Sequence, residues 1–191
     1  SASLLELDEV ARQVHGRSLK TWFFDAPDRP EHAMAGTHAV QTGLGYACST
    51  LARTLTRLGV QADWAVGHSY GELVALWHAG AYDDATLARL THERGQAMAQ
   101  AAPQLPGALA AVGADGAAVA DCLKAWPELE IANLNAPTQT VVGGPGQVLK
   151  DFAQACQQRG WRCALIQGAS AAFHTSRMQP ALTAWREHLQ G

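Results

Sequence analysis

The sequence predicts an α/β fold, and two patterns along the chain carry the prediction. Over residues 37–80, apolar positions at helical spacing are followed by a short apolar run, a turn bounded by glycines and a second helical pattern. This alternation is typical of α/β proteins. Within residues 104–167, further strand and helix patterns alternate. We therefore expect a larger α/β part, residues 1–103 and 168–191, with a small subdomain inserted over residues 104–167.

The larger part is expected to contain several helices and one short strand. Apolar residues recur at intervals of three and four up to Leu58, and Gly59 follows as a C-cap. The run ADWAV has the length of a buried strand. Aspartate is a good N-cap for the third helix. The expected elements are helices over 37–58, up to Gly80, from Asp83 or Asp84 to just before Pro103, and over 178–189, with a strand over 62–66.

The inserted part has the order strand–helix–strand–strand–helix–strand. Pro127 ends the first helix pattern, and the sequence NAPT provides a turn between the second and third strands. This order is that of the split βαβ, or ferredoxin-like, unit. The expected strands lie at 108–114, 128–135, 139–144 and 161–167, and the expected helices at 114–126 and 146–160.

Composition excludes several classes of function. The 191 residues are 48% hydrophobic and 16% charged, with a net charge of −3, so we expect a globular protein and no nucleic-acid partner. The apolar stretches are too short to span a bilayer, and the first residues lack a signal-peptide pattern. The four cysteines and eight histidines lack metal-ligand spacing. We therefore expect a cytoplasmic protein with reduced thiols and without a membrane or metal site.

The sequence Gly67-His68-Ser69-Tyr70-Gly71 has the pattern of a nucleophilic turn between a strand and a helix. Such a turn projects the serine hydroxyl and crowds the backbone, so the residues two before and two after it need to be small. The N–H of Tyr70, at the start of the helix, can stabilise a developing oxyanion. The alternative is an ordinary strand–helix junction that needs glycines.

Arg94 lies on the same helical stripe as Leu87, Leu90 and Met98. A guanidinium on a core-facing stripe needs an anion, and its planar fork suits a carboxylate. A structural salt bridge or a side chain that reaches solvent is the alternative. Gly95 is unusual inside a helix and is expected to give a ligand room to approach.

His174, in the sequence SAAFHTSRM, is the candidate base for a serine nucleophile. A packed or surface histidine is the alternative for a residue of this kind. His68 is adjacent to Ser69 in the sequence, but neighbouring side chains on such a turn point apart.

Together these segments resemble the malonyl-CoA:acyl carrier protein transacylases and the acyltransferase domains of fatty acid, polyunsaturated fatty acid and polyketide synthases. GHSYGE is similar to the nucleophile motif of that family, ERGQAM to its arginine helix, and AAFH to its histidine motif. HAVQTG and IANLNAPTQTVVGG resemble two further segments, and the match covers about residues 37–180. The resemblance implies a hydrolase-like large subdomain with a parallel sheet, incomplete in this sequence, and a ferredoxin-like insert.

The resemblance also implies a reaction and its residues. Ser69 would be the nucleophile, His174 the base, and Arg94 the residue that holds the malonyl carboxylate. Gln41, Tyr70 and Phe173 would line the acyl site, although the family's proline in the segment of Gln41 is replaced by Gly43. The implied reaction moves malonyl from coenzyme A to the phosphopantetheine thiol of an acyl carrier protein, beside other synthase domains and without a cofactor.

Two other functions compete with this expectation. A serine hydrolase of the α/β-hydrolase kind shares the turn around Ser69, but it needs an acid between the serine and the histidine. The acids in that interval include Asp115, Asp121 and Asp151, all in the expected insert. A non-catalytic segment of a synthase is the other competing function.

Overall fold

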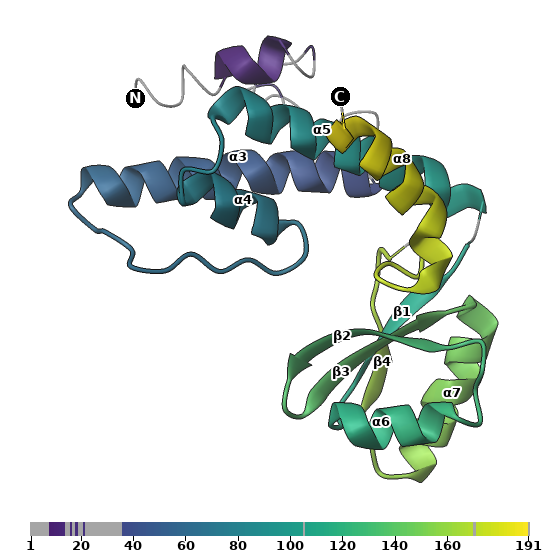
Figure 1. Cartoon of the computed structure of the whole chain (residues 1–191). Helices are drawn as coiled ribbons and strands as arrows, with labels where there is room; N and C mark the ends of the chain where they lie inside the picture. The colour runs from purple at the N-terminus through teal and green to yellow at the C-terminus, as the bar shows by residue number, and fades with distance from the viewer. Residues whose placement is uncertain are drawn as a thin grey trace. The chain divides into compact units, whose positions relative to one another are not determined.

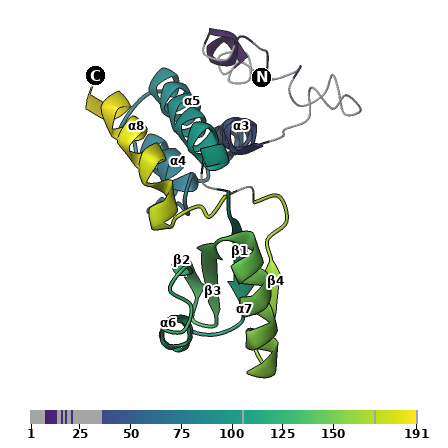
Figure 2. The ribbon, with the colours of Figure 1, turned by 90° about the vertical axis from the view of Figure 1, so that its right-hand side faces the viewer.

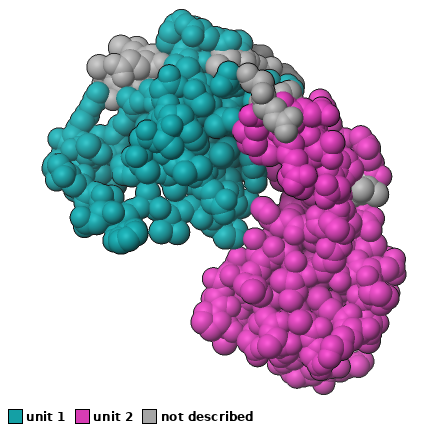
Figure 3. Space-filling model, in the orientation of Figure 1, with its two compact units in different colours: residues 1–96 teal, residues 97–191 magenta. Residues whose placement is uncertain are grey.

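The computed structural model describes residues 8–13, 16, 18, 21, 36–104, 106–169 and 171–190. The chain divides into two compact units, residues 1–96 and 97–191 (Figure 3). Each unit is treated by itself below. The first seven residues, on which the signal-peptide expectation depends, lie outside the described residues.

Helices make up the described part of the first unit. Besides the helical residues 8–13, they are α3 (Gly36–Arg57), α4 (Gly71–His78) and most of α5 (Asp84–Ala101), and α4 packs against α3 (Figure 1). The three helices lie close to their predicted positions because each is specified by local apolar periodicity. Gly80, two residues after the end of α4, has φ of +82°. This left-handed conformation is typical of a glycine that follows a helix, and the helix stops near Gly80 as predicted.

A polar cluster joins these three helices. The indole N–H of Trp77 on α4 donates to Asp84 Oδ1 at the start of α5, over 2.8 Å. Arg53 on α3 pairs with the other carboxylate oxygen of Asp84, and its guanidinium lies 5.5 Å from the Trp77 ring centroid. One carboxylate thus connects all three helices and orients α5 relative to α3.

The strand predicted over residues 62–66 is wrong in this structure. The segment is extended coil, and Trp64 and Val66 are 88% and 92% exposed. A strand exists only through hydrogen bonds to a neighbouring strand, and the described part of the first unit contains no other strand. The parallel sheet expected for the larger part is therefore not seen among the described residues.

The second unit contains a four-stranded sheet covered by two helices on one face. In chain order its elements are β1 (Ala108–Val112), α6 (Gly116–Leu123), β2 (Glu130–Ala136), β3 (Gln139–Gly144), α7 (Gly146–Gln158) and β4 (Cys163–Leu165). The strand order across the sheet is β2-β3-β1-β4, and every neighbouring pair is antiparallel. Figures 1 and 2 show α6 and α7 on the same side of this sheet.

The core of this unit lies between the sheet and the two helices. Its fully buried side chains include Val112 and Val142 from the strands, Val119 from α6, and Leu149 and Phe152 from α7. The elements follow the predicted order, but several are shorter than predicted. For example, α6 begins two residues late because the side chain of Asp115 caps it, accepting from Ala118 N at 2.9 Å.

The chain ends in a helix that packs against the end of α5. After the short helices η2 (Ala102–Gln104) and η3 (Ser176–Met178), α8 spans Gln179–Gln190. Ala181 of α8 is buried with Ala97 and Ala101, beside Trp185. None of the helices in the described ranges combines the length and the apolar character needed to cross a bilayer.

Candidate active site

Ser69 lies on a strained turn at the start of α4. Its φ is +55°, a left-handed conformation that a non-glycine residue rarely adopts. The turn closes tightly, because Gly71 N donates to His68 O at 2.9 Å and Glu72 N donates to Ser69 O at 3.2 Å. Such strain costs about 1–2 kcal/mol and persists where function requires it. The geometry is that of a serine presented at the start of a helix, and it disfavours the ordinary-junction alternative.

Of the two glycines around Ser69, only Gly67 lies where a side chain would not fit. A Cβ at Gly67 would lie 2.2 Å from the backbone atoms of Gly71 and from Glu72 N, so the turn closes only over a glycine. A Cβ at Gly71 would meet no described atom within 4 Å. The expectation that both positions must be small is therefore correct for Gly67 and wrong for Gly71. The backbone of Gly71 and Glu72 lies directly against Gly67, whereas Gly71 is the first residue of α4 and has open space beside it.

This difference predicts unequal effects of one added methyl group. Gly67→Ala should lower the free energy of unfolding by about 3 kcal/mol or more, because backbone atoms cannot move aside without opening the turn. Gly71→Ala is the matched control and should change it by less than about 1 kcal/mol. Urea titrations of both variants measure the two values. Equal losses would contradict this account of the turn.

Arg94 and Gln41 meet Ser69 within the first unit. Arg94 Nη1 donates to Gln41 Oε1 on α3, and Arg94 Nη2 lies 3.4 Å from Ser69 Oγ. Gln41 is 4% exposed, and its amide nitrogen donates to Thr37 Oγ1 at 2.8 Å. The amide oxygen is thereby oriented toward the guanidinium. Three residues singled out in the sequence, far apart along the chain, are thus brought together by α3, α4 and α5.

Arg94 forms no ion pair with a carboxylate among the described residues. The structural salt bridge considered from the sequence is therefore not found there. Burial lowers the pKa of Arg94, while the nearby Tyr70 and Glu72 act in the opposite direction. Arginine nevertheless stays protonated in proteins. A half-buried cation beside Ser69 Oγ is therefore suited to receive an anionic group of a ligand.

Tyr70 has its side chain packed among the helices rather than exposed. It is 5% exposed, and its hydroxyl lies 2.8 Å from Thr91 Oγ1 on α5. Burial raises the pKa of the Tyr70 phenol to about 12, so the phenol keeps its proton at neutral pH. The backbone N–H of Tyr70, which directly follows Ser69, is the part of this residue available for the oxyanion role expected from the sequence.

The space beside Gly95 is occupied by His38 of α3, not open to a ligand. A Cβ at Gly95 would lie 2.8 Å from His38 Cδ2 and 2.9 Å from its Cα. The expectation that this glycine gives a ligand room is therefore wrong. The glycine instead allows α3 and α5 to approach each other closely, and this approach brings Gln41 within reach of Arg94.

A histidine pair at this crossing did not emerge from the sequence. His38 Nε2 and His92 Nδ1 are 3.0 Å apart, and His92 Nε2 lies 2.9 Å from the amide nitrogen of Gln96. Because an amide nitrogen only donates, His92 accepts at Nε2 and donates to His38 from Nδ1. Both rings are then neutral. Burial and the neighbouring His92 lower the pKa of His38.

This pair predicts a pH dependence of stability. The pKa of His38 in the folded chain is below its ordinary value of about 6.5, so the unfolded chain binds this proton more readily. Stability is then full above about pH 6.5 and is lost as the pH falls through the folded pKa. Melting temperatures between pH 7.5 and 5.5 should fall less for His38→Gln than for the parent protein. His78→Gln, at an exposed site, is the control and should keep the parental slope; equal slopes in both variants contradict the prediction.

His174 lies in the second unit, on a loop fixed to the sheet. It is exposed and has φ of +64°. Ala171, three residues before it, bridges Pro106, and Thr175 Oγ1 donates to Ala172 O at 2.6 Å. Ser176 N donates to a carboxylate oxygen of Glu130 on β2, at 2.9 Å.

The loop of His174 covers part of the sheet face opposite α6 and α7. The methyl group of Thr175 lies so close to Gly143 that a Cβ there would be 2.7 Å away. Val142 faces the helices, so its neighbour Gly143 faces the other way. Phe173 beside His174 is half-buried. Packing on the sheet thus holds a strained, exposed histidine, which is how a functional side chain is commonly presented.

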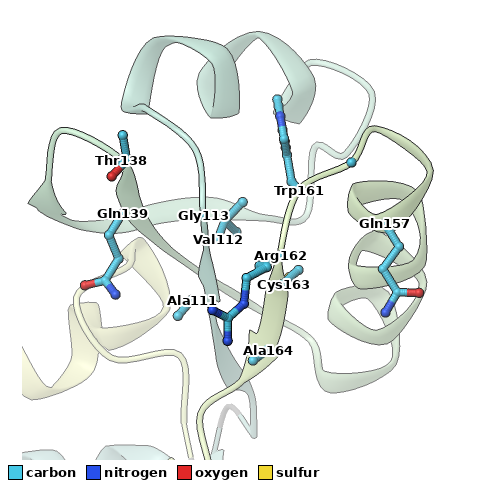
Figure 4. A pocket seen from close by; sticks show the side chains of 11 residues that line it. Ala111, Val112, Gly113, Thr138, Gln139, Gln157, Trp161, Arg162, Cys163 and Ala164 are labelled. Carbon is cyan, nitrogen blue, oxygen red and sulfur yellow. The ribbon is translucent and has the colours of Figure 1, made fainter.

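A separate hollow of about 750 Å³ lies on the sheet of the second unit (Figure 4). It is lined by the end of β1, the start of β3, the last turn of α7 and the segment that leads into β4, and its lining includes Gln139, Gln157 and Arg162. None of the site residues expected from the sequence lines it. Among the described residues, no group of three histidine, cysteine, aspartate or glutamate side chains is placed to hold a metal ion.

The sequence matches the acyl transferase domain family over residues 1–191. It is 33% identical over 157 residues to a malonyl CoA-acyl carrier protein transacylase of Escherichia coli K12, covering 80% of this chain and 51% of that protein. It is 35% identical over 177 residues to the polyketide biosynthesis protein ThaF of Burkholderia thailandensis, covering 90% of this chain and 15% of that protein. The chain thus spans about half of the transacylase and a small part of ThaF.

Solved structures of similar proteins share the fold. The malonyl CoA-acyl carrier protein transacylase of Burkholderia pseudomallei aligns with a TM-score of 0.86 and 30% identity, covering 99% of this chain and 64% of that one. The acyltransferase domain of the polyketide synthase PpsC of Mycobacterium tuberculosis aligns with a TM-score of 0.87 and 26% identity, covering 99% and 55%.

Proposed function

The chain belongs to the acyl transferase domain family, and from this premise we propose that it moves a malonyl group from coenzyme A to the phosphopantetheine thiol of an acyl carrier protein. One observation carries the proposal: the strained Ser69 presents its hydroxyl 3.4 Å from the guanidinium of Arg94. A nucleophile and a cation at this separation fit an acyl group that ends in a carboxylate. Malonyl is a small group of this kind, because a single methylene separates its thioester carbonyl from its free carboxylate.

In the first half of the reaction, Ser69 Oγ attacks the thioester carbonyl of malonyl-CoA. His174 takes the hydroxyl proton as the Oγ–C bond forms. The Tyr70 N–H at the start of α4 stabilises the oxyanion of the tetrahedral intermediate. The C–S bond then breaks, and His174 returns the proton to the sulfur of coenzyme A. A malonyl ester remains on Ser69.

Arg94 binds the malonyl carboxylate during both halves of the reaction. Gln41, itself oriented by Thr37, holds the guanidinium in place, and Phe173 contributes an apolar wall to the acyl site. A charged fork that matches a carboxylate makes charge-assisted hydrogen bonds, which are about twice as strong as neutral ones. Acetyl and other uncharged acyl groups lack this partner, so they would bind poorly.

In the second half, the phosphopantetheine thiol of the carrier protein attacks the ester. His174 removes the thiol proton, the S–C bond forms, and the C–Oγ bond breaks with return of the proton to Ser69. The exchange of thioester for ester and back involves no oxidation or reduction, so the proposal includes no cofactor. The partners are a coenzyme A thioester, an acyl carrier protein and other domains of a synthase.

The fold supports this proposal at a finer level. The element order and the β2-β3-β1-β4 antiparallel sheet are those of a ferredoxin-like unit, and we assign residues 104–167 to such a subdomain. Residues 1–103 and 168–191 would then belong to a hydrolase-like larger part.

Product analysis tests the proposed reaction against its two competitors. The full chain is incubated with radiolabelled malonyl-CoA, with and without an acyl carrier protein, and the label is followed. Acyl transfer predicts labelled Ser69 and then a labelled carrier protein. Free malonate formed without the carrier would show the hydrolase reaction instead. Absence of label on Ser69, with the protein folded, would show that the chain is not catalytic.

A further inference from the structure

The contacts around Ser69 are arranged in two layers that are one helical turn apart. The first, which we call the polar layer, consists of Gln41, Arg94 and Ser69. The second, which we call the clamp layer, consists of Gly45, Thr91 and Tyr70. On α3, Gln41 and Gly45 are four residues apart and therefore lie on one helix face. On α5, Thr91 and Arg94 are three residues apart and also share a face. On the turn, Ser69 and Tyr70 are consecutive residues.

The hydrogen bond of the clamp layer has a defined direction. Thr91 Oγ1 donates its proton to Leu87 O one turn earlier on α5, at 2.7 Å. The Tyr70 hydroxyl must therefore donate to Thr91 Oγ1, across 2.8 Å. Both residues are buried, Tyr70 at 5% and Thr91 at 2% exposure. A buried hydroxyl that loses its partner costs about 1–3 kcal/mol, so this bond strongly favours one position of the ring.

Helix α3 prevents movement of the ring in the other direction. A Cβ at Gly45 would lie 2.1 Å from the Tyr70 hydroxyl oxygen and 3.3 Å from the ring carbon that carries it. The end of the tyrosine therefore occupies the place that any other residue at position 45 would fill. Thr91 on one side and the backbone of α3 on the other hold the phenol between them.

We propose that Thr91 and Gly45 are positioning residues that keep Ser69 aligned with Arg94. Ser69 and Tyr70 are adjacent on one strained turn, so a fixed Tyr70 ring fixes the direction of Ser69 Oγ. Thr91 and Arg94 are one turn apart on a single rigid helix, so the same bond fixes the distance from Oγ to the guanidinium. This inference rests on the proposed function, because it makes the clamp layer a determinant of the preference for carboxylated acyl groups.

Thr91→Val tests the inference, because valine keeps the shape and removes the hydroxyl that accepts from Tyr70. We expect the ratio of kcat/KM for malonyl-CoA over acetyl-CoA to fall by about tenfold or more, since a misplacement of 1 Å can cost about a hundredfold. Thr91→Ser restores the hydroxyl and should restore the ratio. Tyr70→Phe removes the other end of the bond, so the double variant should be no worse than either single one.

Thr54→Val is the matched control. Thr54 Oγ1 donates to Thr50 O at 2.8 Å, the same bond to the preceding turn that Thr91 makes, but at an exposed site of α3. Its replacement by valine should leave the ratio unchanged. If valine acted through a general effect on helices, the ratio would fall equally in Thr54→Val and Thr91→Val. That result would overturn the inference.

The structure of the Thr91→Val variant separates this inference from the proposed function. If the parent protein places no acyl group on Ser69, the proposed function fails, and the clamp is judged by the separation of Ser69 Oγ and Arg94 Nη2 in the variant. A separation still at 3.4 Å, or an unchanged acyl preference, overturns the inference. If the Thr91→Val variant does not fold, the separation of Ser69 Oγ and Arg94 Nη2 and the acyl preference are measured in Tyr70→Phe instead. The same results then support or overturn the inference.

Discussion

Ser69→Ala in the full chain is expected to abolish the acyl-enzyme and to lower the rate of malonyl transfer by about 10⁴-fold or more. The reason is that the ester forms on Oγ itself, and no nearby hydroxyl in the polar layer can replace it. Gel autoradiography with labelled malonyl-CoA, followed by mass spectrometry of the peptide around residue 69, measures the loss.

The fold should survive this change, because alanine has the smaller side chain and the turn is closed by the backbone bonds from Gly71 N to His68 O and from Glu72 N to Ser69 O. Ser49→Ala is the control. Ser49 is fully buried on α3, and its hydroxyl donates only within that helix, to Gly45 O at 2.7 Å and Tyr46 O at 3.2 Å. In the Ser49→Ala variant, Ser69 should still be labelled. If the Ser69→Ala protein still acquires label, Ser69 is not the acyl acceptor.

Arg94→Ala is expected to lower kcat/KM for malonyl-CoA by about 10²–10³-fold while leaving that for acetyl-CoA within a few-fold of the parent. Removing one partner of a buried charge pair costs about 2–5 kcal/mol, which is about 30- to 5,000-fold, and the expected loss lies within these limits. Arg94→Lys should recover only part of the loss, because an ammonium group cannot bind a carboxylate in two-point fashion and hold Gln41 at the same time. Steady-state kinetics with both thioesters measure the selectivity.

Arg89→Ala provides the comparison on the same helix. Arg89 is exposed on α5, so its removal changes the net charge by the same amount without touching the site. It should leave both rates unchanged. An equal loss for malonyl-CoA and acetyl-CoA in Arg94→Ala would mean that the arginine supports the fold of the site rather than the carboxylate.

Much of the fold could be predicted from the sequence, and the exceptions have a common cause. The helices α3, α5 and α7 lie within two residues of their predicted ends, because periodicity and capping are local. The strand over 62–66 was predicted from an equally local signal, yet strand formation depends on a neighbour that the described residues of the first unit do not contain. Local apolar character alone could not show this.

The candidate site shows the same division. Ser69, Arg94 and Gln41 were singled out by motif, and the structure brings them into contact. Thr91 was missed, although it lies one turn before Arg94 on the same helix face, because a threonine inside a helix carries no chemical signal. The role proposed for Thr91 depends on Tyr70, whose hydroxyl lies against it.

Residue types at short spacing were enough to single out Ser69, Arg94 and Gln41 as candidates and to place most of the elements. Two further features are visible only in the packed helices: Gly95 makes room for His38 and not for a ligand, and Tyr70 donates to Thr91. Those contacts join residues 21 to 57 positions apart in the chain. They arise from the way α3, α4 and α5 pack together, and a local pattern cannot specify which faces of three helices will meet.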